Sequence, residues 1–392
     1  MNFSQVPDRS NTRSVKWDLG KKIYKSEDIL PMWVADMDFM APTQVIEDLK
    51  KRLEHGVFGY TITDKEIETS IQGWFSDHYH WDISTDWITY SPGVVPSLHM
   101  IVESLTNEKD RIMIQTPVYP PFFDVVEKHN RTLVENPLML EDGRYEMDYD
   151  HIEEEFKKGV SLFILCNPHN PVGRVWTYDE LNKLGQLCLQ YNVFIVSDEI
   201  HADIIYRSHQ HVPIASLSKD LANITISCYA PTKTFNLAGL QVSYLVTPNS
   251  EIRTKVKNFF GKFGLGMLNT MGITGMESAY LKGEKWLEEL ILIIEENKKI
   301  VEDMIQPYHE FVKLIQSEGT YLLWLDFRGL QMDDEELKLF LQEKAKVGFN
   351  NGKSFGVNGE GFMRMNIATT TENVKEGTRR ILKALDKYVA KE

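Results

Sequence analysis

Residues 161–173 read SLFILCNPHNPVG, a short apolar run followed directly by a loop with two Asn-Pro pairs and a glycine. The run Ser161–Leu165 predicts a buried strand, because it is too short for a helix and turn residues bound it. Comparable runs occur at Arg111–Gln115, Val193–Ser197, Ile224–Cys228 and Val242–Val246, with helical patterns between several of them at about 94–105, 121–129, 148–156 and 178–190. Apolar strands that alternate with helices predict an α/β fold, with a mostly parallel sheet covered by helices on both faces.

The last third of the sequence has a different pattern. Its elements are a long charged helix at 285–305, a strand at 320–327, a helix at 333–343, a strand at 362–367 and a helix at 372–389. This order predicts a smaller α+β domain. We therefore expect residues 46–285 to form a large domain, residues 286–392 a small C-terminal domain, and residues 1–45 an N-terminal segment that contributes to the small domain.

The composition is that of an ordinary globular protein, with 392 residues, 42% of them hydrophobic and 26% charged. The net charge of −14 repels nucleic acid and anionic lipid, so neither is an expected partner. The cysteines, at Cys166, Cys188 and Cys228, are too widely spaced for a metal-binding knuckle. With a polar N-terminus and a longest aliphatic run of only Leu290–Ile294, the sequence predicts a cytoplasmic protein without a signal peptide or membrane span.

Four loops carry residues that packing alone does not require. Asn170 lies in the loop 165–173, and Asp198 directly follows the run 193–197. Lys233 lies in APTKTFNLAGL at 230–240, and Gly93 in YSPGVVPSL leads into a helix. Taken singly, each has an ordinary structural explanation: a turn, a structural carboxylate, a surface lysine or a helix cap.

The shared position of these residues favours a joint chemical role, since ligands of parallel sheets bind beyond the carboxyl ends of the strands. Burial penalises an ammonium group, so a lysine in an apolar loop is a candidate amine nucleophile. A buried carboxylate requires a cation, and the N–H groups at a helix N-terminus bind phosphate. An amine, an acid and an anion site are the groups that a pyridoxal 5′-phosphate (PLP) site needs.

The sequence resembles the PLP-dependent enzymes of fold type I, the aspartate-aminotransferase superfamily, over nearly the whole chain. More narrowly, it resembles the MalY/PatB-type branch of cystathionine β-lyases, which cleave C–S bonds. The motifs that carry the resemblance are PMWVADMDF at 31–39, FGYT at 58–61, SPGVVPSL at 91–98, TPVYPPF at 116–122, CNPHNPVG at 166–173, SDEIHAD at 197–203, APTKTFNLAGL at 230–240 and FMRMNIA at 362–368. The resemblance implies a large domain with a mostly parallel seven-stranded sheet, a smaller α+β domain, PLP as cofactor, and a homodimer with the active site at its interface.

The resemblance also implies roles at the reacting centre. Lys233 is expected to join the cofactor aldehyde and to move the proton at the substrate Cα. Asp198 is expected to pair with the pyridine nitrogen, which keeps the ring an electron sink. Asn170 corresponds to the residue that bonds the ring hydroxyl O3′, and Tyr119 to the one that stacks on the ring, although Tyr119 is equally explained as a core tyrosine.

A second set of implied roles concerns the phosphate and the substrate. Gly93, Val94 and Val95 are expected to present backbone N–H groups to the phosphate. Tyr60 is expected to reach the phosphate in the other subunit. Arg364 is expected to bind the substrate α-carboxylate, a task that suits its planar fork, and its alternative is a surface arginine near a strand.

Three positions depart from the common pattern of the family. Ala230 stands where many members have a Ser or Thr that binds phosphate, and the neighbouring Thr232 is a candidate substitute. Gln241 stands where many aminotransferases have an arginine. His201 replaces a common tyrosine and is a candidate second contact to O3′. The phosphate grip is therefore expected to be less charged than usual and to depend more on backbone dipoles.

The function implied by the resemblance is a PLP-dependent C–S β-lyase that acts on cystathionine or a similar cysteine S-conjugate and releases pyruvate and ammonia. An aminotransferase is one alternative, because it shares the removal of the Cα proton and differs only afterwards. A second alternative is a regulatory or interaction protein of this fold, in which catalysis is incidental. The expected partner in the first two cases is a small amino-acid substrate.

Overall fold

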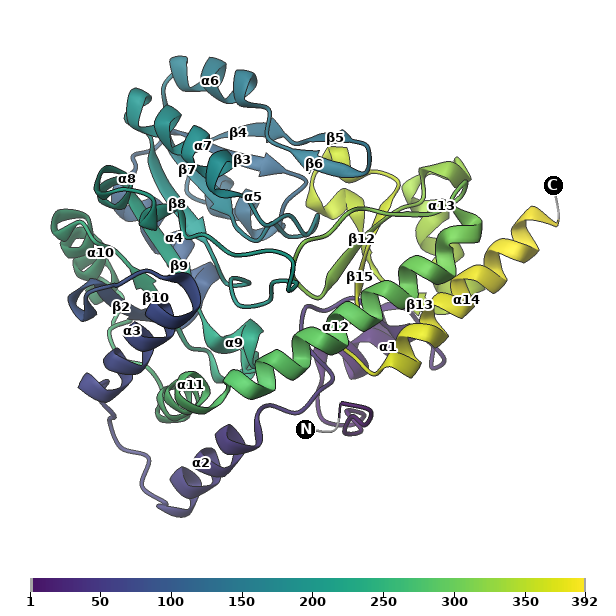
Figure 1. The fold of residues 1–392 in the computed structure, drawn as a ribbon, viewed down its shortest axis with the longest axis horizontal. Helices are drawn as coiled ribbons and strands as arrows, with labels where there is room; N and C mark the ends of the chain where they lie inside the picture. The colour runs from purple at the N-terminus through teal and green to yellow at the C-terminus, as the bar shows by residue number, and fades with distance from the viewer. Residues whose placement is uncertain (1–2, 391–392) are drawn as a thin grey trace.

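A seven-stranded sheet forms the centre of the protein (Figure 1). The structure is a computed structural model and describes residues 3–390. The strand order is β2 (Ile88–Ser91), β10 (Ser243–Val246), β9 (Thr225–Tyr229), β8 (Phe194–Asp198), β7 (Val160–Cys166), β3 (Arg111–Thr116) and β4 (Thr132–Pro137). Every neighbouring pair from β9 to β4 is parallel, while β10 is antiparallel to both of its neighbours. The predicted α/β class and mostly parallel sheet are confirmed.

The five strands that the apolar runs predicted are all present, within two residues of the expected bounds. The strands β2 and β4 were not predicted. The first has only four residues, and the second, TLVENP, lies at the sheet edge with polar residues along it. Such strands carry little of the apolar signal that marks a strand buried on both faces.

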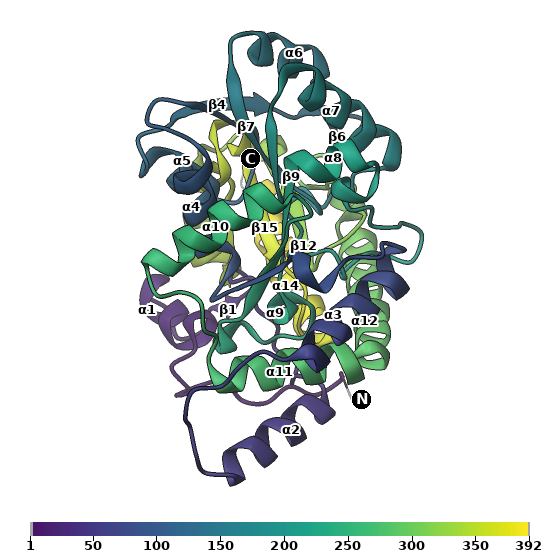
Figure 2. The ribbon, with the colours of Figure 1, turned by 90° about the vertical axis from the view of Figure 1, so that its left-hand side faces the viewer.

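Helices cover both faces of this sheet (Figure 2). On one face, α4 (Val94–Leu105), α5 (Pro121–Glu127) and α10 (Ser250–Lys262) pack on Ile114, Ile164 and Leu245. The other face carries α6 (Tyr149–Lys157), α7 (Tyr178–Tyr191), α8 (Lys219–Ile224) and α3 (Lys65–Tyr79). The remaining helices of this half are α2 (Thr43–Glu54), α9 (Pro231–Thr234) and α11 (Thr270–Lys282), and a hairpin joins β5 (Met139–Glu141) to β6 (Arg144–Glu146).

A second, antiparallel sheet lies in the last third of the chain. Its order is β11 (Lys313–Leu314), β12 (Leu322–Asp326), β15 (Phe362–Asn366) and β14 (Asn350–Asn351). The helices here are α12 (Glu284–Ile305), α13 (Asp334–Leu339) and α14 (Thr371–Val389). The N-terminal segment holds α1 (Gly20–Ile23) and β1 (Leu30–Pro31), and β1 pairs in parallel with β13 (Val347–Gly348).

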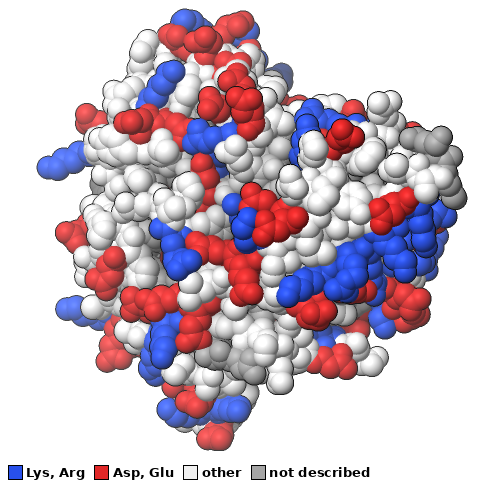
Figure 3. Space-filling view, turned by 45° about the vertical axis from the view of Figure 1, so that its right-hand side comes forward, with Lys and Arg blue, Asp and Glu red and all other residues white. Residues whose placement is uncertain are grey.

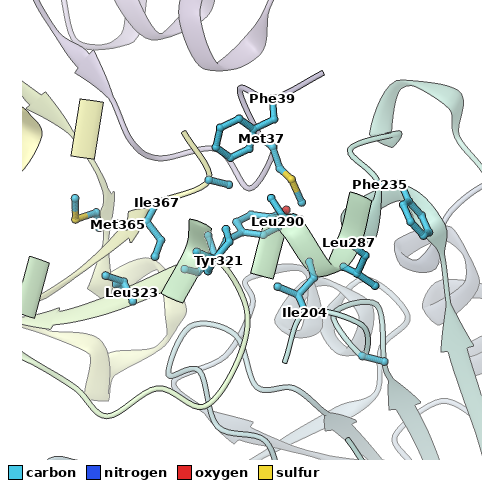
Figure 4. Close-up of a cluster of buried hydrophobic side chains, with 14 of the residues drawn as sticks. Met37, Phe39, Ile204, Phe235, Leu287, Leu290, Tyr321, Leu323, Met365 and Ile367 are labelled. Atoms are coloured by element: carbon cyan, nitrogen blue, oxygen red, sulfur yellow. The ribbon is translucent and has the colours of Figure 1, made fainter. Parts of the chain in front are cut away.

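A hydrophobic cluster joins the two halves (Figure 4). The long helix α12 contributes an apolar stripe with the spacing of a helix face, including Leu287, Leu290 and Ile294, all buried. Tyr321 and Phe39 lie against this stripe in the same cluster. The N-terminal segment, the large sheet and the second sheet therefore share one hydrophobic core. In this core, residues of β9 and β10 belong to the same cluster as residues of β12 and β15.

The surface carries both signs of charge. Acidic and basic side chains are interspersed over the face in Figure 3, with one band of Lys and Arg at its right. Across residues 3–390, the structure contains no helix with the length and apolar character that a bilayer span requires.

Candidate active site

A cavity of about 300 Å³ lies beyond the carboxyl ends of the parallel strands. It is lined by most of the residues named from the sequence, namely Gly93, Val94, Val95, Tyr119, Asn170, Asp198, His201, Thr232 and Lys233. Ala35, Cys166, Ala238 and Gln241 also line it, together with the apolar residues Pro92, Pro96, Ile200 and Val242. Tyr60 and Arg364 do not line this cavity. Residues from the N-terminal segment and from the carboxyl ends of five strands, β2, β3, β7, β8 and β9, thus meet in one place, because strands that run in the same direction deliver their loops to the same sheet edge.

Asp198 is the last residue of β8 and is buried. Its Oδ1 accepts a hydrogen bond from the backbone N–H of Ile200 at 3.1 Å. Within residues 3–390, it has no ion pair with a lysine or arginine. Burial raises the pKa of Asp198 to about 7, and the negative charge of Glu199 acts in the same direction. The carboxylate therefore lies in a place that favours a cationic partner.

Lys233 lies in the short helix α9, which follows β9 directly and begins at Pro231. Its Nζ donates a hydrogen bond to the backbone carbonyl of Ala35 at 2.5 Å. Burial, and after it the charge of Arg364, lower the pKa of Lys233 to about 8. About a tenth of this amine is therefore unprotonated at pH 7, far more than for an ordinary lysine, and nucleophilic or base catalysis uses that neutral form.

Arg364 is buried in the middle of β15, which excludes a surface arginine. Its Nη1 donates to Asn170 Oδ1 at 2.9 Å, and its Nη2 donates to Asn350 Oδ1 at 2.8 Å and to the Trp33 carbonyl at 3.1 Å. Its Nε is buried and has no protein partner. Burial lowers the pKa of Arg364 to about 10, far above neutrality, so the side chain remains a cation next to the cavity.

The N-terminus of α4 faces the cavity at Gly93, Val94 and Val95. The amides of Val94 and Val95 lie in the first turn, where a helix offers them no internal acceptor. Pro96 has no N–H at all, so Val94 and Val95 are the residues of this turn that offer backbone donors at the cavity. Thr232 and Gln241 line the same space, and no Lys or Arg apart from Lys233 does so among the described residues.

His201 follows Asp198 in the loop after β8 and is buried against the ring of Tyr321, with 5.8 Å between ring centroids. Burial lowers the pKa of His201 well below its ordinary value, so the ring is neutral. Its Nδ1 is buried without a hydrogen-bond partner. An unpartnered ring nitrogen beside the cavity is a polar group available to a bound molecule.

Tyr60 lies in the connection between α2 and α3 and is 97% exposed. Val57, Phe58 and Ile62, which flank it, are exposed apolar residues. This connection runs along the outside of the protein at the lower left of Figure 1. Within one chain, Tyr60 is therefore separate from the cavity.

Sequence reasoning missed two kinds of site contact. One is the carbonyl of Ala35, which accepts from Lys233; it lies in the quoted PMWVADMDF motif, but a backbone acceptor leaves no trace in residue type. The other is a buried network behind Asp198, in which Glu199 accepts hydrogen bonds from Ser227 at 3.0 Å and from Tyr229 and pairs with His211 at 2.8 Å. Among the described residues, no group of His, Cys, Asp or Glu is arranged to hold a metal ion.

The fold and this cavity define a class of protein, the PLP-dependent enzymes of fold type I. The chain belongs to the aminotransferase class I and II family, whose family model matches residues 27–381.

Three known proteins are similar to this chain over nearly its whole length. Cystathionine β-lyase PatB of Bacillus subtilis (strain 168) is 44% identical over 386 residues, which cover 98% of this chain and 100% of that protein. A PLP-bound putative aminotransferase from Clostridium difficile 630 has 46% identity and a TM-score of 0.96, with 98% of this chain and 99% of that one covered. Cystalysin from Treponema denticola, which contains PLP, has 37% identity, a TM-score of 0.96 and 99% coverage of both chains.

Proposed function

We propose that the protein is a PLP-dependent C–S β-lyase that cleaves cystathionine or a related cysteine S-conjugate. With cystathionine and water, the products are the thiol homocysteine, pyruvate and ammonia. The observation that carries this proposal is the pair formed by Lys233 and Asp198 in one cavity, an amine whose pKa is lowered and a carboxyl whose pKa is raised. The similarity to a cystathionine β-lyase over the full length of both chains supports the choice of reaction.

The residues present fit PLP. Asp198 offers a buried carboxylate without a cationic partner, as a protonated pyridine nitrogen requires, and the first turn of α4 offers amides to the phosphate. Asn170 is proposed to bond O3′, with the unpartnered His201 beside it, and Tyr119 to cover the ring. When bound, PLP supplies an electron sink for the charge left by loss of the Cα proton.

Arg364 is proposed to hold the substrate α-carboxylate. Its guanidinium is fixed by Asn170, Asn350 and the Trp33 carbonyl before any substrate binds, so little side-chain entropy is lost on binding. A carboxylate at this place would stabilise a buried cation and would hold one end of the substrate in a fixed position.

Lys233 is proposed to move the proton. With a substrate bound, a free Nζ would accept the Cα proton and become an ammonium. The same group then donates that proton to the departing sulfur, which leaves as a thiol. An amine whose pKa lies near the working pH serves both steps, because neither protonation state is strongly favoured.

The active form is proposed to be a homodimer, in which Tyr60 of one copy reaches the phosphate bound by the other. The exposed apolar residues Val57, Phe58 and Ile62 beside Tyr60 support this arrangement, since a second copy that covers them removes apolar surface from water. Thr232 is proposed to add a hydroxyl to the phosphate grip where Ala230 has none.

We further propose a cytoplasmic location, which the three unpaired, buried cysteines favour. The division into a large domain at 46–285, a small domain at 286–392 and the N-terminal segment 1–45 stays a prediction.

A product assay tests the function. The purified protein is incubated with PLP and cystathionine, with and without a keto acid, and pyruvate is followed over time. The proposal expects steady pyruvate formation without any keto acid. An aminotransferase would instead form no pyruvate, would consume one equivalent of cystathionine per site to give its keto acid, and would then stop unless a keto acid is added. A protein with only a regulatory role would neither consume cystathionine nor form pyruvate, so the remaining cystathionine is measured as well.

A further inference from the structure

Tyr321 lies just before β12 and is fully buried. Its hydroxyl donates a hydrogen bond to the backbone carbonyl of Ala35 at 2.9 Å, and the same oxygen accepts the bond from Lys233 Nζ at 2.5 Å. One carbonyl oxygen therefore joins a phenol from the last third of the chain to the amine of the cavity. Figure 4 places Tyr321 in the cluster next to Met37, two residues after Ala35.

The segment around this carbonyl is held on both sides. Asn366 Nδ2 donates to the Val34 carbonyl at 2.6 Å and to the Asp36 carbonyl at 2.7 Å. Asn236 accepts from the Met37 N–H at 3.0 Å and donates to the Met37 carbonyl at 3.0 Å. Because the neighbouring peptide groups are tied, the direction of the Ala35 carbonyl is set by the fold and not by the lysine.

We propose that Tyr321 is a positioning residue for Lys233, acting through the Ala35 carbonyl. A carbonyl oxygen has two acceptor sites, and the phenol occupies one of them, which leaves a single direction for the amine. The amine held there uses an N–H for this carbonyl, so its lone pair stays free for a proton whenever it is not bonded to the cofactor. This inference rests on the proposed function, in which the free amine moves the Cα proton.

The charge around the amine fixes the direction of the expected effect. Burial raises the pKa of Tyr321, so it acts only as a neutral donor. A carbonyl that already accepts from a phenol attracts an ammonium less strongly, so loss of the hydroxyl favours the protonated lysine. The other groups that act on the Lys233 charge are Arg364, Asp36 and Asp198, and the neighbouring His201 is neutral.

The test compares Tyr321→Phe with Tyr24→Phe. Tyr24 is a matched control, because it is also buried and also donates to a backbone carbonyl, that of Phe349, at 3.0 Å. In cofactor-free protein, acetylation of Lys233 by acetic anhydride is followed by peptide mass spectrometry across pH. We expect labelling at pH 7 to fall about threefold in Tyr321→Phe and to stay unchanged in Tyr24→Phe.

A second measurement uses the PLP-loaded enzyme with cystathionine. Tyr321→Phe is expected to lower kcat about fivefold with KM within about twofold, as loss of one neutral hydrogen bond that orients the base implies. Equal labelling of Lys233 in wild type and Tyr321→Phe, or an equal loss in Tyr24→Phe, would overturn the inference. Tyr321→Met, which also lacks the hydroxyl, repeats the test if the Phe variant does not fold. Labelling needs no substrate, so it still decides the role of Tyr321 if the wild type forms no pyruvate.

Discussion

Arg364 and Asn170 are joined by a hydrogen bond of 2.9 Å from Nη1 to Oδ1, although they are 194 residues apart in the sequence. The bond links β15 of the second sheet to the loop after β7 of the large sheet. Arg364, the proposed ligand of the substrate carboxylate, therefore directly contacts Asn170, the proposed ligand of O3′, and each side chain holds the other in position. Any substitution at Arg364 disturbs the substrate end and the cofactor end of the cavity together.

Arg364→Gln is expected to lower kcat/KM for cystathionine about tenfold to a hundredfold, chiefly through KM. A neutral amide cannot form the charge-assisted pair with a carboxylate, and it leaves Asn170 without its donor. Steady-state kinetics measure the change. Arg328→Gln serves as the control, because Arg328 follows β12, pairs with Asp326 at the end of that strand and is partly exposed. Equal KM values in wild type and Arg364→Gln would exclude the carboxylate role.

Lys233→Ala is expected to reduce pyruvate formation by at least about a thousandfold, because both the covalent link and the proton carrier are lost. Borohydride treatment of the PLP-loaded protein should attach cofactor to the wild type and not to this variant, as read by mass spectrometry. Lys262→Ala, at an exposed lysine of α10, should behave as the wild type in both respects. Turnover that survives in Lys233→Ala would refute the assignment.

Asp198 predicts an unusual pH dependence of stability in the cofactor-free protein. Its pKa is about 7 when folded against an ordinary 3.8, so between these values the folded state binds the extra proton. The free energy of unfolding therefore falls as pH rises from about 4 to 7, on the order of a few kcal/mol from this group, and then levels off.

Asp198→Asn is expected to remove this contribution, so that the variant gains stability over wild type at pH 8 but not at pH 4. Urea unfolding at the two pH values measures it, with Asp77→Asn, at an exposed carboxylate of α3, as the control that keeps the wild-type dependence. The same variant should lose cofactor affinity and form pyruvate about a hundredfold more slowly. Unchanged pH dependence of unfolding in Asp198→Asn would contradict the raised pKa.

The proposed shared active site predicts complementation between two weak variants. Tyr60→Ala lacks the phenol that is proposed to bind the phosphate in the other copy, and Lys233→Ala lacks the amine of its own site. Refolded as a mixture, half of the dimers combine one chain of each kind and hold one intact site of two, so about a quarter of wild-type activity is expected. Pyruvate formation by the mixture is compared with each variant alone. Activity that never exceeds the mean of the two would show that Tyr60 serves its own chain or no site.

The sequence predicted much of this cavity because its signals are local. An apolar run followed by a polar loop marks a buried strand end, and Asn170, Asp198 and Lys233 each follow such a run. Strand β4 escaped prediction because its pattern is mixed, and the role of Ala35 escaped because its contact is made by the backbone. The position of Tyr60 on the outside of the chain was consistent with a role between copies but follows only from packing.

By itself, the sequence determined five strands of the large sheet, the helices between several of them, and that the loops with Asn170, Asp198 and Lys233 share the carboxyl edge of that sheet, since periodicity and chain direction are properties of neighbouring residues. Only the tertiary structure decided that the Ala35 carbonyl receives both Lys233 and Tyr321, and that Arg364 is tied to Asn170. These contacts join segments hundreds of residues apart, and their distances depend on how the N-terminal segment and the second sheet pack against the first, which no local pattern encodes.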